Sequence, residues 1–224
     1  MNTTAPYATA YVAGRTALRD ALAFADSDLT PEAHARRRAD MIRAARTQLA
    51  AATPVAPRAD ISASVDVLAQ RSPRTADDIA LQAREREKVQ QLLDAGQPLG
   101  GIIANASELR VAAVLDAIET LPVVLASGSP ETVADELRAA AFSRLVELGA
   151  PDALTAAAAD TEAATVTLWS QALTEAQAGE VSIATRQAIY AADLDGYREA
   201  FSDDVSVNWG VIEHIEAASP APAQ

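Results

Sequence analysis

Five arginines within eleven residues form the densest group of side chains able to bind a ligand. They lie in EAHARRRADMIRAAR, residues 32–46, and are Arg36, Arg37, Arg38, Arg43 and Arg46. Guanidinium groups bind phosphate oxygens through paired N–H donors, so the run suggests nucleic acid as a partner, with an ordinary solvated helix face as the alternative. These five arginines are therefore the candidate interaction residues.

Helical spacing separates these arginines onto two faces. At 100° per residue, Arg36, Arg43 and Arg46 share a face with Glu32 and Asp40. Each of these two carboxylates is four residues from Arg36, a spacing that suits ion pairs within a helix. The face keeps a net charge of only about +1 and has no interleaved aromatic residues for base stacking. It therefore predicts a largely self-neutralised, solvated surface and makes nucleic acid an unfavoured partner.

Arg38 falls on the opposite, apolar face, among Ile42, Ala45 and Leu49. A guanidinium in that position must extend along its stem to water, pair with a carboxylate, or reach a second chain. A partner within the fold, a contact between subunits and an exposed helix end all stay open. We expect a carboxylate of the acidic C-terminal part to meet it.

Other patterns that often signal catalysis are incomplete. The only histidines, His34 and His214, lack the spacing of metal ligands, and the chain has no cysteine. The glycine-rich stretch at 99–107 has no phosphate-loop lysine and reads as a turn into a helix, and Ser129 suits a helix cap better than a nucleophile. We predict that the protein is not an enzyme and holds neither metal nor cofactor.

Composition and charge narrow the class of protein further. The 224 residues carry a formal charge of −13, with 13 basic and 11 acidic side chains in residues 1–90 but 5 and 20 in residues 91–224. An acidic C-terminal part repels nucleic acid and anionic membranes and favours basic protein surfaces. No signal peptide or membrane-spanning stretch is visible, so we expect a soluble, cytoplasmic protein, in the host cytoplasm or virion if a phage encodes it.

Periodicity and composition predict an all-α protein. Alanine, leucine, glutamate and arginine are abundant and aromatic residues few, which favours helix over sheet. Proline after a capping residue indicates helix starts, and Gly96, Gly149 and Gly179 suit helix ends. The expected helices cover 6–26, 31–52, 74–95, 107–121, 130–148, 151–178, 181–202 and 209–218.

Two helical faces stand out as candidate core. Val111, Val114, Leu115, Ile118 and Leu121 recur at helical spacing. A second, aromatic stripe comprises Ile183, Tyr190, Leu194, Tyr197 and Phe201. We predict both to be buried.

The expected organisation is a bundle of seven or eight helices that begins with a long helical hairpin. The hairpin is 1–52, a proline-bearing connector is 53–73, the main bundle is 74–218, and 219–224 is a flexible tail. Alternating apolar residues at 60–70 and 204–212 leave open one small β-pair in place of helices.

These features favour a structural or assembly protein that packs against copies of itself or within a larger particle. Alanine-rich faces permit close helix–helix approach, and a chain with this composition and no catalytic motif is typical of bacteriophage head or connector components. The expected partners are proteins, above all further copies of the chain. The alternative is a nucleic-acid-binding regulator that uses the arginine-bearing N-terminal hairpin.

Overall fold

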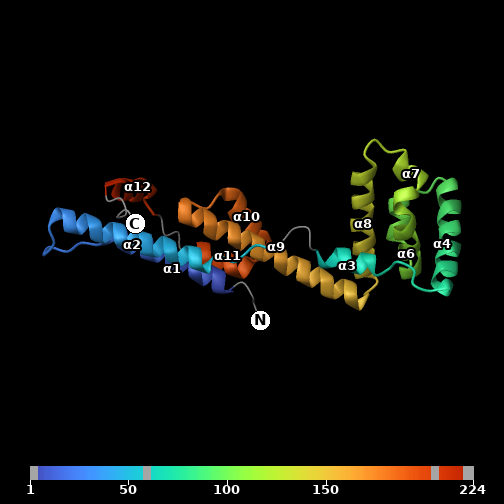
Figure 1. The fold of residues 1–224 in the computed structure, drawn as a ribbon, viewed down its shortest axis with the longest axis horizontal. Helices are drawn as coiled ribbons and strands as arrows, with labels where there is room; N and C mark the ends of the chain where they lie inside the picture. Colours follow the sequence, from blue (N-terminus) through green and yellow to red (C-terminus); the bar gives the residue numbers. More distant parts are fainter. Residues whose placement is uncertain (1–4, 58–61, 203–206, 219–224) are drawn as a thin grey trace. The chain divides into compact units, whose positions relative to one another are not determined.

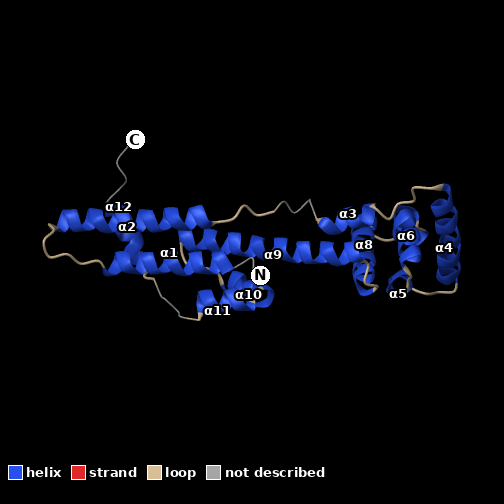
Figure 2. Ribbon diagram, turned by 90° about the horizontal axis from the view of Figure 1, so that it is seen from below, coloured by secondary structure: helices blue, strands red, loops and turns tan. Residues whose placement is uncertain are grey.

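The computed structural model describes residues 5–57, 62–202 and 207–218. Within these ranges all regular structure is helical, with twelve α-helices, one short 3₁₀ helix and no strand (Figure 2). The all-α prediction is confirmed, but the helices outnumber the seven or eight expected. The helices of these ranges are too short or too polar for a membrane span. The expected tail at 219–224 lies outside the described residues.

The chain divides into two compact units. Unit 1 comprises residues 1–57 and 162–224, and unit 2 comprises 58–161. The expected connector at 53–73 contains the first division, but residues 74–218, expected as one bundle, are shared between both units. Unit 1 has 9 basic and 15 acidic residues and unit 2 has 9 and 16, so each unit is acidic. Each unit therefore combines residues from the slightly basic N-terminal part of the sequence with residues from its acidic C-terminal part.

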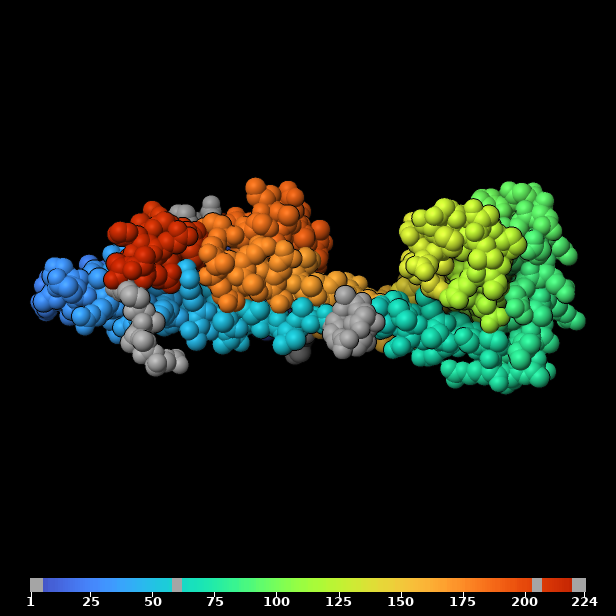
Figure 3. All heavy atoms as spheres, turned by 45° about the horizontal axis from the view of Figure 1, so that its top comes forward, coloured from blue at the N-terminus to red at the C-terminus, as the bar shows by residue number. Residues whose placement is uncertain are grey.

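Unit 1 is built on α1 and α2, which pack along each other (Figure 1). A Cβ on Gly14 of α1 would collide with the side chain of Leu49 on α2, so the glycine permits the close approach. Trp169 of α9 and Ile189 of α10 are fully buried in the same core. The helices are α1 (Ala5–Ala23), α2 (Pro31–Ala52), the part of α9 (Pro151–Ala178) from Glu162 on, α10 (Ile183–Ala192), α11 (Leu194–Phe201) and α12 (Trp209–Ala218). Figure 3 shows α12 lying over the N-terminal helices.

Asp193 divides the helix expected at 181–202 into α10 and α11. Its backbone takes a non-helical conformation, and its side chain accepts a hydrogen bond from the Gly196 backbone N–H at 3.0 Å. A second carboxylate oxygen accepts the indole N–H of Trp169, also at 3.0 Å. An aspartate at this position caps a new helix, and the buried tryptophan fixes the site of the break.

The predicted aromatic core stripe is wrong at three of its five residues. Ile183 is 75% exposed, Tyr190 is 56% exposed and Leu194 is 38% exposed, while Tyr197 and Phe201 are half-buried and contact each other. Because the chain breaks at Asp193, the residues before and after it no longer share one continuous helical face. An apolar ridge on α10 is left in contact with solvent.

In unit 2, α6 lies between α4 and α8 (Figures 1 and 2). The predicted face of residues 111–121 is buried apart from Leu115, which is half-buried. The helices are α3 (Ala63–Ala69), α4 (Ala76–Asp94), α5 (Leu99–Ala104), α6 (Glu108–Ala117), η1 (Ile118–Thr120), α7 (Pro122–Leu125), α8 (Pro130–Glu147) and α9 up to Thr161.

The proposed β-pair is replaced by helices in the described residues. Residues 63–69 form α3 and residues 209–218 form α12, while 58–61 and 203–206 lie outside the described part. Both segments had an ambiguous apolar pattern, which short buried helices and strands share. The side chains that settle α3 as a helix come from a distant part of the sequence, as described below.

Helix ends follow the predicted signals in most places. Thr30 caps α2 by accepting the Ala33 N–H, and Gly96 and Gly149 end their helices with φ of 84° and 77°. The helix expected from residue 74 begins two residues later, because Thr75 and Asp78 form a reciprocal capping box and α4 begins at Ala76. Short α5 and α7 were not expected, since neither spans enough residues to show a period.

Candidate protein-binding site

The five arginines of the run do not converge on one site. Arg43 pairs with Asp40 on the same helix, and Arg46 pairs with Glu216 of α12 at 3.1 Å. Arg36 and Arg37 lie exposed on the surface of α2. Asp40 therefore pairs with Arg43 and not with Arg36 as predicted, and the carboxylate that meets Arg46 comes from α12 and not from the same helix.

Arg38 meets backbone carbonyls and not the expected carboxylate. Its Nε donates to the Ala21 carbonyl at 3.1 Å, and its Nη2 donates to the Leu22 carbonyl. These carbonyls belong to the last turn of α1, where helical partners are missing and the helix dipole is negative. Arg38 therefore caps α1 from the neighbouring helix, which accounts for a cation on the apolar side of α2.

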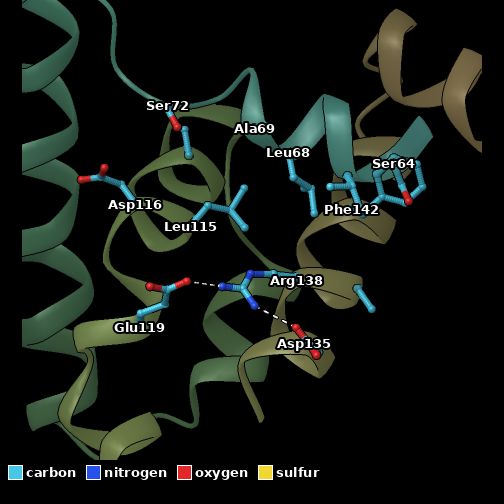
Figure 4. A pocket seen from close by; sticks show the side chains of 13 residues that line it. Ser64, Leu68, Ala69, Ser72, Leu115, Asp116, Glu119, Asp135, Arg138 and Phe142 are labelled. Atoms are coloured by element: carbon cyan, nitrogen blue, oxygen red, sulfur yellow. Dashed lines mark hydrogen bonds and ion pairs between the residues drawn. The ribbon is translucent and has the colours of Figure 1, made fainter. Parts of the chain in front are cut away.

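A groove of about 600 Å³ opens in unit 2 between α3, α6, η1 and α8. Its apolar floor includes Leu68, Leu115 and Phe142, whose side chains gather along it in Figure 4. Val65, at the edge on α3, is 58% exposed. Apolar floors of this size bind organic ligands or protein side chains, because burying them releases ordered water.

The polar rim of the groove is acidic. Arg138 lies between Glu119 and Asp135, with Nη2 2.6 Å from Glu119 Oε1 and Nη1 2.8 Å from Asp135 Oδ1 (Figure 4). Two carboxylates thus share one guanidinium, which leaves a net negative charge on this side. Asp116, also on the rim, pairs with Arg86 at 3.0 Å. The rim favours a ligand with a cationic group.

Asp160 of α9 fixes the helix that forms one wall of the groove. Its carboxylate accepts the Ser62 hydroxyl and the Ala63 backbone N–H, both at 2.8 Å, and the Ser64 N–H at 3.1 Å. These groups lie at the N-terminus of α3, where helical N–H groups have no partner. Burial raises the pKa of Asp160, but the hydrogen bonds from the serines and Ala63 outweigh it and lower the pKa below its usual value.

Asp160→Ala is expected to loosen α3 and with it the wall of the groove. Loss of a charged cap costs about 1–2 kcal/mol of stability. Amide hydrogen exchange at 63–69 is expected to speed up, while exchange in α4 stays near the wild-type rate. Asp66→Ala, an exposed change on α3 itself, is the control. Equal protection of α3 in Asp160→Ala and the control would contradict this role.

A second pocket of about 600 Å³ adjoins the groove and shares Ser72 and Ala112 with it. Arg71, on its lining, pairs with Asp152 at 2.9 Å and Glu108 at 3.2 Å. The Arg71 hydrogen bond outweighs burial and lowers the pKa of Asp152. The ion pairs of Arg71 fix the loop between α3 and α4. They therefore also hold Ser72 of this loop, at the edge that the groove and the second pocket share.

Sequence reasoning missed the groove entirely. Its lining comes from three segments, 64–72, 112–119 and 135–142, and no motif joins them. One signal was present: Val65 and Val67 are both apolar, although two residues apart on a helix lie on different faces. Which of those residues stay exposed depends on the packing of α3, and that depends on Asp160.

The groove of unit 2 has an apolar floor that a ligand could cover and a charged rim around it. Among described residues, no cluster of three or more His, Asp or Glu side chains is arranged to hold a metal ion. Comparison with protein-family models, curated proteins and solved structures gives no match to this chain.

Proposed function

We propose that this chain is a non-enzymatic assembly protein that associates with further copies of itself through the groove of unit 2. The observation that carries the proposal is the open apolar floor formed by Leu68, Leu115 and Phe142. A groove of this kind suits an amphipathic helix that lays its apolar face on the floor. The acidic rim and the exposed Val65 extend the surface that a partner would cover.

An exposed apolar residue of the groove supports the same proposal. Val65 of α3 lines the groove and is 58% exposed. Single exposed apolar side chains are ordinary on a protein surface, but one that lines an apolar groove marks an interaction surface. The finer assignment, a bacteriophage head or connector component, rests on composition alone, and flanking capsid, portal or terminase genes would support it.

Sedimentation velocity over a wide concentration range tests the proposal. The wild-type chain is expected to gain mass with concentration, whereas Val65→Glu/Ala139→Glu, at two exposed positions of the groove, is expected to remain monomeric. The added carboxylates put charge on an apolar surface beside an acidic rim, and are expected to weaken association about tenfold or more. Leu81→Glu/Val123→Glu, at exposed positions outside the groove, is the matched control. A wild-type chain that stays monomeric throughout would overturn the proposal.

The alternative function, nucleic-acid binding by the arginine run, finds support only in the exposed Arg36 and Arg37. Each unit has an excess of carboxylates, which opposes the approach of phosphates. This function predicts a salt-dependent gel shift that Arg36→Ala/Arg37→Ala/Arg43→Ala abolishes. Absence of a shift at low salt would remove it.

A further inference from the structure

We propose that α12 is a detachable docking helix whose binding surface on unit 1 also accepts the α12 of a second copy. This surface, the α12 seat, is formed by Arg15 of α1, Arg46 of α2, Glu180 between α9 and α10, and Arg186 of α10. Figure 3 shows α12 over the N-terminal helices of this unit. The seat belongs to unit 1 alone, so the inference does not rest on association through the groove of unit 2.

Three side chains on one face of α12 hold it in the seat. Trp209, Ile212 and Glu216 stand at i, i+3 and i+7, which places them on one side of the helix. Ile212 is fully buried in the core of unit 1. The indole N–H of Trp209 donates to Glu180 Oε1 at 2.8 Å, and Glu216 pairs with Arg46 at 3.1 Å. Anchors at this spacing are the means by which an amphipathic helix binds a partner surface.

The α12 seat is cationic and α12 is anionic. Arg15 and Arg186 both pair with Glu180, at 3.1 and 3.0 Å, and the Arg15 guanidinium lies 5.7 Å from the ring centroid of Trp209. Three arginines stand against one glutamate in the seat, although unit 1 as a whole has 9 basic and 15 acidic residues. The helix carries two glutamates and neither lysine nor arginine. The seat therefore matches an acidic helix with a tryptophan at one end.

Few buried side chains hold α12, which permits it to leave the seat. Six of its ten residues are exposed, and Ile212 alone is fully buried within Trp209–Ala218. In contrast, α1 buries Ala8, Leu18 and Ala21 completely. A segment with few buried apolar contacts opens at a lower free-energy cost than the core and does so before the whole protein unfolds.

The α12 of a second copy makes the same contacts with the seat as the chain's own α12. Exchange therefore needs no new complementary surface, which is the basis of domain swapping. In dilute solution the chain's own α12 occupies the seat, because its covalent attachment gives it an effective concentration on the order of millimolar. Exchange is expected where copies are crowded, or where the helix and the seat of one chain repel each other.

Reversal of charge across the Glu216–Arg46 pair tests the inference. Arg46→Glu reverses the seat and Glu216→Arg reverses the helix, so in either variant alone like charges meet both within one chain and between copies. In an equimolar mixture, each helix meets an opposite charge on the seat of the other variant. Each variant alone is expected to be monomeric. The mixture is expected to form a 1:1 heterodimer about tenfold or more in excess of either homodimer, measured by native mass spectrometry.

Two controls accompany the mixture. Arg36→Glu and Glu213→Arg make the same changes at exposed positions of α2 and α12 outside the seat, and their mixture is expected to form no excess of heterodimer. The double variant Arg46→Glu/Glu216→Arg restores opposite charges within one chain. Each single variant is expected to lose amide-exchange protection at 209–218 about tenfold, and the double variant to regain it. Every chain also carries Val65→Glu/Ala139→Glu, so that the groove of unit 2 does not contribute.

The outcomes decide the inference without reference to the groove. An excess of heterodimer in the mixture, with protection of α12 regained, supports exchange between copies. A mixture with no more heterodimer than the control pair would show that α12 binds only its own chain. Single variants that keep wild-type protection at 209–218 would show that the Glu216–Arg46 pair does not hold the helix. Either of these two results would overturn the inference and leave the proposed function to its own test.

Discussion

Trp169→Ala is expected to lower the free energy of unfolding by about 4–5 kcal/mol, the largest effect of any single change considered for unit 1. Trp169 is fully buried, and its indole N–H donates to Asp193 at 3.0 Å. Truncation would leave a large cavity and remove one donor from a buried carboxylate. Chemical denaturation followed by circular dichroism at 222 nm measures the loss.

Trp169→Phe separates the two contributions. Phenylalanine keeps most of the buried ring but removes the N–H donor to Asp193, so the expected loss is about 1–3 kcal/mol. Leu81→Ala, at an exposed position, is the control and is expected to change stability little. Equal losses for Trp169→Ala and Trp169→Phe would show that the hydrogen bond, and not the packing, dominates. A Trp169→Ala chain as stable as the control would contradict the core assignment.

Glu85→Gln is expected to destabilise unit 2 by about 2–4 kcal/mol at neutral pH. Glu85 is 7% exposed on α4, pairs with Lys88, and accepts the Arg110 Nε of α6 at 2.9 Å. The glutamine is nearly the same shape but leaves both cations without the opposing charge. Glu87→Gln, exposed on the same helix, is the matched control and is expected to be nearly neutral.

The same variant has a predictable pH dependence. The Lys88 hydrogen bond, together with Arg110, lowers the pKa of Glu85 below its ordinary value of 4.5 despite burial. A carboxylate with a lowered folded-state pKa stabilises the fold above its unfolded pKa, and this contribution disappears as the pH falls through the folded value. The stability difference between wild type and Glu85→Gln is therefore expected to be full at pH 7 and to shrink below about pH 4.5. A constant difference from pH 7 to pH 3 would contradict the ion pairing.

Local signals predicted the long helices well. Thr30 and Pro31 start α2, and Pro151 starts α9, at the expected residues. These features are readable because capping groups and their targets lie within four residues of each other. The same locality explains the success at Gly96 and Gly149.

Contacts between distant residues explain what was missed. Asp193 ends α10 because Trp169, 24 residues earlier, holds its carboxylate. Asp160 fixes α3 from a position 98 residues beyond Ser62. Arg38 lies on the apolar face of α2 because its guanidinium there donates a hydrogen bond to a carbonyl at the end of α1. The residue pattern of one helix does not indicate which distant residue supplies the hydrogen-bond partner of these side chains. The groove was missed for the same reason, because its lining comes from three separate segments of the chain.

Hydroxyl-radical footprinting of the wild-type chain, compared between dilute and concentrated solution, tests the central claim most directly. Side-chain oxidation at Val65 and Phe142 in the groove is expected to fall as the chain associates, while oxidation at Leu81 stays constant. Association that leaves Val65 and Phe142 as reactive as in dilute solution would show that the copies meet elsewhere and would contradict assembly through the groove.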